Sequence, residues 1–342
     1  MVWHEQKGAA AVLNLIPDSQ RRTLDELRER LDFDAGERSS KRSAFWIMLT
    51  LSGIIAVSGV LADSTATVIG AMIVAPLSTP ILGIGLGIVT ARARLVLSSF
   101  TYVLSGLVLV TFFGWLFAQL MPDPISVLSN SQVLGRTSPT LVDLFAAIAT
   151  GFAGAIAITR RDVGDVLPGV AIAISLVPPL GVVGVCLGTG SPSLALGAFV
   201  LFASNVIAMI ITSIVVFTTA GYGREAVTEA THEGQAAPRR GRVYVILTAA
   251  LIVVAVPMII NSLSSLWSSQ IAAAADSWLT DAGDTGGEVT DVSWSGSTVT
   301  VSVLAPQELP PIDDLQTTVD DLVPWDPEVV VVHTVGGRQG GD

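Results

Sequence analysis

The sequence predicts an all-α polytopic membrane protein of seven transmembrane helices, built as a 3+3 inverted repeat plus one helix, with a small extracytoplasmic α+β domain. Three observations predict this fold class: long charge-free runs, a one-sided distribution of basic residues, and a repeat at an offset of 99 residues. Apolar residues make up 51% of the 342-residue chain and charged residues 14%. An ordinary soluble domain carries roughly 25% charged residues, so a membrane environment is favoured.

The charge-free runs give the number of spans. They cover residues 43–62, 64–91, 95–122, 144–159, 166–223 and 243–275. A helix needs about twenty apolar residues to cross ~30 Å of hydrocarbon. The run 166–223 is therefore long enough for two spans, with the turn at 189–193, and the total is seven. No cleavable signal is predicted within residues 1–42, which are charged. Cys186 is the single cysteine, which argues against disulfides and cysteine-metal sites.

Basic residues give the orientation. With the N-terminus in the cytoplasm, sixteen of the eighteen Lys and Arg fall on the cytoplasmic side, and the exceptions are Arg136 and Arg338. This positive-inside pattern predicts a multi-pass inner-membrane protein with a cytoplasmic N-terminus and an extracytoplasmic C-terminal domain. The acidity is confined to that domain, because residues 264–342 hold thirteen Asp and Glu against one Arg. The charge of the chain therefore says little about what crosses the bilayer.

A shift of 99 residues aligns the chain with itself without a gap. The aligned pairs include Asp63 with Asp162, Gly70 with Gly169, Ile73 with Ile172, Leu77 with Leu176, Pro80 with Pro179, Gly85 with Gly184, Thr90 with Thr189, Phe100 with Phe199 and Ser105 with Ser204. Each copy holds three spans, an odd number, so the second copy enters the membrane from the opposite side. This is the inverted-repeat arrangement of many secondary transporters.

Both copies place prolines inside an apolar span. Pro76 and Pro80 interrupt the first copy, and Pro178 and Pro179 interrupt the second. Proline removes a backbone donor, and free backbone groups are not tolerated against lipid, so both breaks are expected to face inward. The predicted binding site near the bilayer midplane consists of Pro76, Ser78, Thr79, Pro80, Ser175, Pro178, Pro179, Ser204 and Asn205. The alternative is that the prolines only kink helices around glycine-rich packing.

Three aspartates stand near the ends of the spans. Asp63 and Asp162 come before the broken helices and Asp143 opens the fourth span. A carboxylate at a helix start accepts hydrogen bonds from the exposed amides, so we expect all three to cap helices or to gate the path. Metal sites, cofactors and catalytic residues are not predicted, since the three histidines lie outside the spans.

The soluble segments complete the domain plan. An apolar stretch at 9–16 and leucines at helical spacing from Leu24 to Leu31 predict one strand and one packed or interfacial helix, with a partly disordered tail as the alternative. In the outer domain, 289–294 and 298–304 predict a hairpin, 311–322 a helix and 328–335 a strand. The predicted divisions are a cytoplasmic strand-helix segment (1–42), the first repeat (43–122, helix broken at 75–80), an outer loop (123–140), the second repeat (141–220, helix broken at 175–180), a cytoplasmic loop (221–242), the seventh helix (243–263) and an acidic α+β domain (264–342).

Two long motifs carry a resemblance to a known family. V-I-G-A-M-I-V-A-P-L-S-T-P-I-L-G at 68–83 and G-V-A-I-A-I-S-L-V-P-P-L at 169–180 occur in order, with G-F-A-G-A at 151–155 between them. They resemble the uncharacterised hydrophobic-domain family of bacterial and archaeal membrane proteins, a domain of unknown function. The resemblance covers about residues 44–223 and implies the membrane fold but no substrate. Ser78 stands where the family pattern would have methionine, and the N-terminal region is shorter than a complete α/β domain.

Three functions remain open at this level. The first is a secondary transporter or facilitator of a small solute, whose site lies where the two discontinuous helices cross. The others are an ion-conducting pore and a membrane-anchored sensor or scaffold that acts through the outer domain. An enzyme is not expected, because the spans contain no nucleophile-base pair. The expected partners are the lipid bilayer, an unknown small solute or ion, and further copies of the chain in a homo-oligomer, with no nucleic acid.

Overall fold

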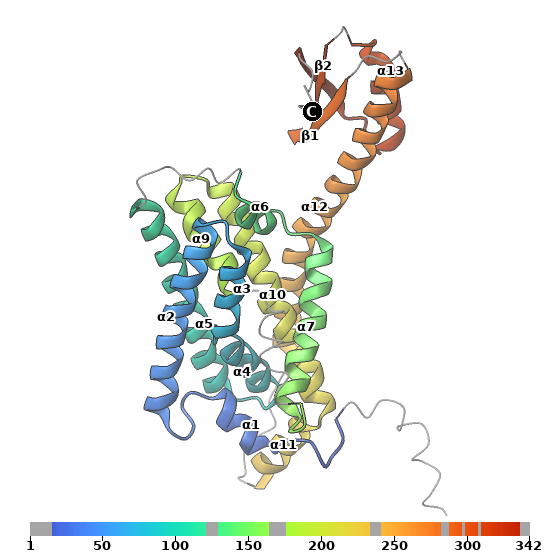
Figure 1. The fold of residues 1–342 in the computed structure, drawn as a ribbon. Coiled ribbons are helices and arrows are strands. Elements are labelled where there is room, and N and C mark those ends of the chain that lie inside the picture. Colours follow the sequence, from blue (N-terminus) through green and yellow to red (C-terminus); the bar gives the residue numbers. More distant parts are fainter. Residues whose placement is uncertain are drawn as a thin grey trace, which may run out of the picture. The chain divides into compact units, whose positions relative to one another are not determined.

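The computed structural model describes residues 16–120, 129–163, 176–232, 241–281, 287–295, 298–306 and 309–335. The chain forms two compact units, Met1–Met258 and Ile259–Asp342. Figure 1 shows the elements of both. The first unit is helical and the second contains a small sheet.

The helices of the first unit follow the predicted spans closely. They are α1 (Leu24–Leu31), α2 (Arg38–Leu61), α3 (Thr65–Val74), α4 (Ser78–Val89), α5 (Ala93–Leu120), α6 (Ser131–Thr137), α7 (Leu141–Thr159), α9 (Val177–Gly188), α10 (Pro192–Thr219) and α11 (Tyr222–His232), and α12 (Gly241–Asp281) continues into the second unit. Within the described ranges, five helices are long and apolar enough to cross a membrane, or six if α3 and α4 count as one bent span. The shorter α9 is also apolar. The chain is therefore mostly helical with several membrane-like helices, and part of the expected fifth span lies outside the described residues.

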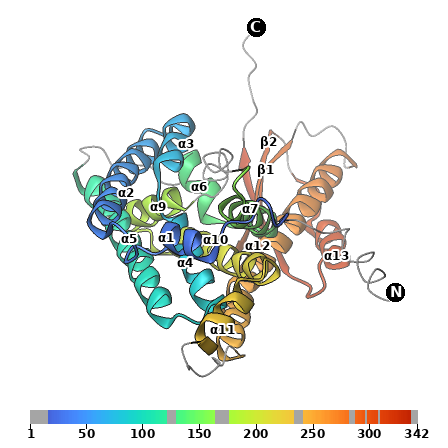
Figure 2. The ribbon, with the colours of Figure 1, turned by 90° about the horizontal axis from the view of Figure 1, so that it is seen from below.

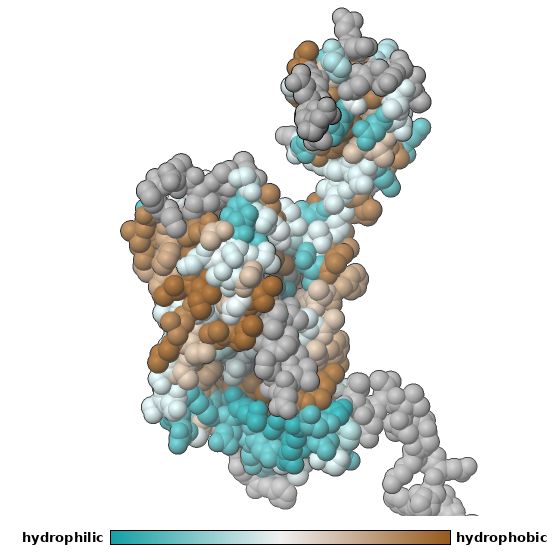
Figure 3. Space-filling model, viewed as in Figure 1, coloured by the Kyte–Doolittle hydropathy of each residue, from teal (hydrophilic) through white to brown (hydrophobic). Residues whose placement is uncertain are grey.

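The surface of the first unit agrees with a lipid environment. Large apolar side chains on α5 are exposed, namely Leu97, Phe100, Leu104, Val108 and Phe112. Figure 3 shows apolar colour along the sides of the helical bundle and a hydrophilic cap over the end that carries α1 and α11. An exposed apolar surface of this extent marks a membrane or protein interface.

The span predicted at 64–91 is interrupted. Helices α3 and α4 meet at an angle of 46° across Ala75, Pro76 and Leu77. Pro76 has no N–H to continue α3, and Thr79 N–H donates to Pro76 O (3.3 Å) as α4 begins. Pro80 lies in the first turn of α4, where proline is tolerated. The interruption thus covers 75–77, and Pro76 is the proline within it.

The offset of 99 residues relates the observed helix bounds. Residues 78–89 of α4 become 177–188, the bounds of α9, and residues 93–120 of α5 become 192–219, the bounds of α10. The turns also correspond, since Arg92 N–H donates to Gly87 O and Ser191 N–H donates to Cys186 O, both at 2.8 Å. Ala91 and Gly190 hold matching positive φ angles of 56° and 74°.

This matched turn gives a stability prediction. A side chain with a Cβ is strained at positive φ, by about 1–2 kcal/mol, whereas glycine is not. Ala91→Gly should therefore raise the free energy of unfolding by about 1 kcal/mol, and Gly190→Ala should lower it by a similar amount. Thermal unfolding in detergent measures both. Shifts of the same sign in the two variants would contradict the shared turn geometry.

The short and long helices that the offset relates pack crosswise. Helix α4 packs on α10, and α9 packs on α5. At one crossing Gly85 faces Ser213, and at the other Gly184 faces Gly114. These are corresponding positions, because 85 and 114 become 184 and 213 under the offset. Figure 1 shows α4 and α9 toward opposite ends of the bundle.

Helix α1 lies at one end of the bundle and contacts α4, α11 and the end of α7. Its buried leucines join the main core, and α1 packs on α4 (Figure 2). On the other side Arg28 pairs with Glu229 of α11 at 2.8 Å, and Arg161 pairs with Glu26 at 2.8 Å. Arg22 N–H donates to Thr159 O at the end of α7 (2.9 Å). The predicted helix near Leu24 is therefore packed, whereas the strand predicted at 9–16 lies almost wholly outside the described residues.

The second unit is built on a three-stranded sheet in the order β1 (Glu288–Ser295), β2 (Thr298–Ala305) and β3 (Glu328–Val335). β1 and β2 are antiparallel, as predicted for a hairpin, and β3 runs parallel to β2 after α13 (Ile312–Leu322). Alternate side chains of β2 are buried and pack with α13 and the end of α12. The predicted outer segments are present as three strands and a helix.

Candidate functional site

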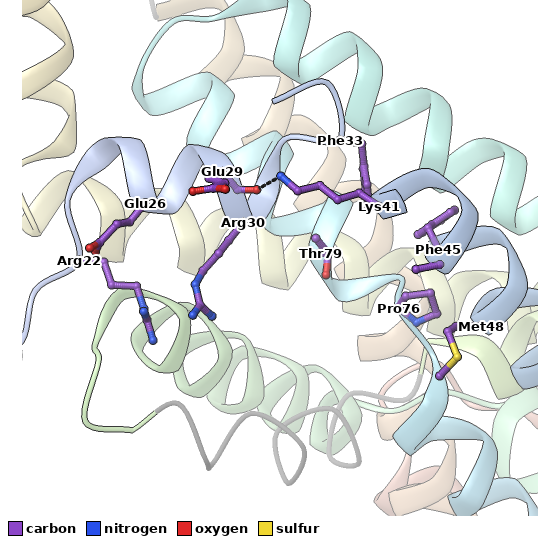
Figure 4. A pocket seen from close by; sticks show the side chains of 11 residues that line it. Arg22, Glu26, Glu29, Arg30, Phe33, Lys41, Phe45, Met48, Pro76 and Thr79 are labelled. Carbon is purple, nitrogen blue, oxygen red and sulfur yellow. Dashed lines mark hydrogen bonds between the residues drawn. The ribbon is translucent and has the colours of Figure 1, made fainter. Parts of the chain in front are cut away.

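A cavity of about 640 Å³ lies beside the interruption between α3 and α4. Figure 4 shows its lining. The lining residues come from α1 and the segments on either side of it, from α2, from the break and from the first turn of α4. They are Arg22, Glu26, Glu29, Arg30, Phe33, Lys41, Ala44, Phe45, Met48, Pro76 and Thr79. We call it the basic cavity, for the reasons given below.

A capping box fixes the charged wall. Thr23 Oγ accepts from Glu26 N–H (3.2 Å), and Glu26 Oε2 accepts from Thr23 N–H (3.1 Å). This arrangement sets the start of α1. The leucines of α1 are buried in the core, and Glu26, Glu29 and Arg30 line the cavity. Lys41 Nζ donates to Ala35 O (2.8 Å) and to Glu29 O, which holds the lysine at the rim.

Aromatic side chains form the apolar wall. The rings of Phe33 and Phe45 meet edge to face at 5.1 Å, and Phe33 lies 4.6 Å from Tyr102. Met48 and Pro76 extend this wall toward the break (Figure 4). The cavity thus combines a charged rim with an apolar interior.

The charges of the rim do not cancel. Glu26 accepts two hydrogen bonds from Arg161 (2.8 and 2.9 Å), and this contact lowers the pKa of Glu26. Burial, together with the nearby positive charge of Arg30, lowers the pKa of Arg22. Arg22 Nε is buried and has no hydrogen-bond partner in the described part of the chain. Because Arg161 already compensates Glu26, the positive charges of Arg22, Arg30 and Lys41 exceed the one remaining carboxylate, Glu29.

A second cavity of about 220 Å³ lies among α6, α7 and α10. Its lining is Gly135, Arg136, Asp143, Ala146, Ala147, Leu201 and Asn205. Asp143 accepts from Thr140 N–H (2.8 Å) and Thr140 Oγ (2.9 Å) at the start of α7. Arg136 donates to Gln132 O (2.8 Å) and Gln132 Oε1 (3.1 Å), and burial lowers its pKa.

The two cavities have lining residues at positions that the offset of 99 residues relates. The offset of 99 residues takes Ala44 to Asp143 and Met48 to Ala147, and each member of these pairs lines its own cavity. α2 begins at the α1 end of the bundle, whereas α7 ends there, as the hydrogen bond of Thr159 with Arg22 shows. The two linings therefore lie at opposite ends of the bundle (Figure 1).

The predicted binding residues are divided between these cavities. Pro76 and Thr79 line the basic cavity, and Asn205 lines the second cavity. Ser204 is buried and its Oγ donates to Leu201 O within the same helix (2.7 Å). The remaining residues are Ser78 and Pro80 in the first turn of α4, Pro178 and Pro179 in the first turn of α9, and Ser175, which lies outside the described residues.

The interior around the break at 75–77 and the start of α9 is apolar. Leu77, at the first interruption, is fully buried, and Leu176, before α9, is 4% exposed. Both belong to the same hydrophobic cluster. The described residues thus place an apolar core, rather than a shared polar chamber, around these two leucines.

The predicted capping aspartates differ in their contacts. Asp63 accepts from Ser131 Oγ (2.7 Å) and Gln132 N–H (3.1 Å) of α6, and the Ser131 hydrogen bond lowers the pKa of Asp63. The start of α3 is capped instead by Ser64, which accepts from Thr67 N–H (3.4 Å). Asp162 pairs with Arg160 (2.6 Å), and this hydrogen bond lowers the pKa of Asp162.

The charged lining of the basic cavity was not foreseen from the sequence. In the sequence these charged residues are recognisable only as parts of a charged N-terminal segment. They are Arg22, Glu26, Glu29, Arg30 and Lys41. The signal that could have found them is the Thr23-x-x-Glu26 capping box ahead of three leucines, which indicates a docked helix with one charged face.

Comparisons with known proteins agree with the resemblance. Residues 72–211 match the model of the family described as Domain of unknown function (DUF389). The uncharacterized protein MJ0678 of Methanocaldococcus jannaschii is 32% identical over 195 residues, which cover 57% of this chain and 60% of that protein. No solved structure gives a significant match. Residues 72–211, which include the break at 75–77 and α9, are therefore similar to the DUF389 family of domains of unknown function.

Proposed function

We propose that the protein is a secondary transporter or facilitator of a small solute in the cytoplasmic (inner) membrane, with the α1 end of the bundle in the cytoplasm. The two copies form an inverted repeat, and each copy opens one cavity to its own side of the membrane. The solute passes from one cavity to the other as the copies rock against each other.

The observation that carries the proposal is the pair of related cavities. Ala44 and Met48 on α2 correspond to Asp143 and Ala147 on α7, and they line cavities at opposite ends of the bundle. The crosswise packing of α4 on α10 and of α9 on α5 supports the same symmetry. Inverted repeats with interrupted helices are the usual architecture of alternating-access carriers.

The proposal also assigns a transport state to the structure, from the difference in volume between the two cavities. The basic cavity measures about 640 Å³ and the second cavity about 220 Å³. With basic residues on the cytoplasmic side, the wider cavity opens inward. We therefore assign an inward-open state, in which the outer cavity is contracted.

Cysteine labelling tests the proposal without knowledge of the solute. In a Cys186→Ala background, which removes the single native cysteine, we place Met48→Cys or Ala147→Cys in oriented membrane vesicles. A membrane-impermeant maleimide should label Met48→Cys only from the cytoplasmic side and Ala147→Cys only from the outer side. Crosslinking that holds the cytoplasmic cavity closed should slow the first reaction and speed the second.

Other outcomes would overturn the proposal. Rapid labelling of either cysteine from both sides would indicate a continuous pore, which single-channel currents would verify. Labelling of both cysteines from the same side would contradict the inverted repeat. If the crosslink changes neither labelling rate, the protein is a rigid membrane scaffold and not a carrier.

A further inference from the structure

We infer that the basic cavity binds an organic anion, with a carboxylate or phosphate group at Arg22, Arg30 and Lys41 and an apolar portion against Phe33, Phe45 and Met48. This inference names the class of solute and rests on the proposed function for its role in transport. It depends on contacts in one cavity, and the anion site itself is testable without any flux.

The charge balance favours an anion over a cation. Three basic side chains line the cavity, and of its two carboxylates Glu26 is already paired with Arg161. Arg22 contributes a buried Nε without a hydrogen-bond partner in the described ranges. A buried guanidinium donor without an acceptor costs free energy, and an anionic oxygen would supply that acceptor.

The apolar wall argues for an organic rather than an inorganic anion. The apolar surface of the cavity would be poorly covered by water or by a small inorganic ion. This surface is formed by Phe33, Phe45, Met48 and Pro76. A volume of about 640 Å³ is within the range of small-molecule sites. A molecule with an anionic head and an apolar body matches both parts of the lining.

The anion could come from solution or from a lipid headgroup, because the cavity lies at the hydrophilic end of the bundle (Figure 3). Phe33 and Phe45 form the apolar wall of the cavity. Pro76 of the break and Thr79 of α4 line the same cavity (Figure 4). A soluble anion can reach this interior without drawing acyl chains out of the bilayer. We therefore assign a soluble organic anion.

The test measures binding of 2-naphthoate to the purified full-length chain, with 2-naphthamide as the uncharged analogue of the same shape. Naphthoate should bind at least about tenfold more tightly than the amide, since each charge-assisted contact adds to the affinity. Arg30→Gln and Lys41→Gln should each weaken naphthoate binding about tenfold and leave naphthamide unchanged. Glu29→Gln should strengthen naphthoate binding, because it removes the opposing carboxylate.

The controls separate charge in the cavity from charge on the protein. Arg94→Gln removes an exposed positive charge at the start of α5, outside the cavity lining, and should not change binding. Arg30 is exposed, so Arg30→Gln should keep the melting temperature of the native chain even if Lys41→Gln disturbs the loop before α2. Equal affinities for naphthoate and naphthamide, or equal effects of Arg30→Gln and Arg94→Gln, would overturn the inference.

Nanodiscs decide between the two sources of the anion. Naphthoate should bind equally in phosphatidylcholine discs and in discs that also contain phosphatidylglycerol. If naphthoate no longer binds in the discs that contain phosphatidylglycerol, the assignment to a soluble anion is overturned and the lipid headgroup is the occupant. The labelling experiment tests the transporter proposal separately. Labelling of the two cysteines from opposite sides, without tighter binding of naphthoate than of naphthamide, would reject only the anion site. Tighter binding of naphthoate, with both cysteines labelled from the same side, would reject only the carrier.

Discussion

Gly114→Val should lower the free energy of unfolding of the helical unit by about 3 kcal/mol, at the upper end of the range for overpacked sites. At this position α5 crosses α9 with backbone against backbone. A Cβ at Gly114 would lie 2.8 Å from Gly184 Cα and 2.9 Å from Val185 N. Backbone atoms cannot turn aside as a flexible side chain can, so the two helices would have to separate. Denaturation in mixed detergent micelles measures the change.

The matched control is Gly70→Val, since a Cβ at Gly70 would meet no atom within 4 Å in the described structure. It should change stability little. Gly184→Val should destabilise as Gly114→Val does, because its Cβ would lie 2.7 Å from Gly114 Cα. If Gly114→Val is as stable as the Gly70 variant, α5 and α9 do not cross this closely.

Pro76→Ala should reduce the maleimide labelling rate of Met48→Cys about tenfold and leave the melting temperature nearly unchanged. Alanine restores the backbone N–H and favours helix by about 3 kcal/mol over proline, so α3 and α4 should join and reduce their 46° bend. Pro76 and Met48 line the same cavity, which would narrow as the bend closes. Stopped-flow labelling in the Cys186→Ala background gives the rate.

Pro192→Ala is the control for the second prediction. Pro192 stands at the first position of α10, where proline fits a helix, and it interrupts nothing. Its replacement should leave the labelling rate unchanged. An unchanged rate for Pro76→Ala as well would show that the proline only kinks the helix and does not shape the cavity.

The helices were largely predictable because their hydrophobic runs are long and their turns carry strong signals. The turn at Gly190 and the hairpin between β1 and β2 lie where the sequence indicates them. Helices α6 and α11 were missed, since the first falls in a segment expected as an outer loop and the second in one expected as a cytoplasmic loop. Tyr222 shows what stabilises α11: it is fully buried and its hydroxyl donates to Arg22 O (2.7 Å). Such a contact joins residues 200 positions apart and leaves no local pattern.

The candidate site was less predictable than the helices. The sequence indicated Pro76 and Thr79, which do line the basic cavity, but not the charged residues opposite them. Most of those side chains lie on α1 or just before it, and they reach the cavity because Leu24, Leu27 and Leu31 pack α1 against α4. This packing is a tertiary contact, which leaves no local pattern in the sequence. Asn205 was expected beside the same prolines, yet it lines the cavity at the other end of the bundle.

On the proposed transport mechanism, the contacts of α1 predict a rate that depends on ionic strength. α1 packs into the main core through buried leucines, each worth about 1.5–3 kcal/mol, and ion pairs also join it to the end of α7 and to α11. The side chains of one such pair, Arg161 and Glu26, are 44% and 42% exposed. Exposed pairs contribute about 0–1 kcal/mol and weaken as salt shortens the screening length. If the copies rock as proposed, added salt should weaken the ion-paired contacts of α1 and leave its leucine packing unchanged.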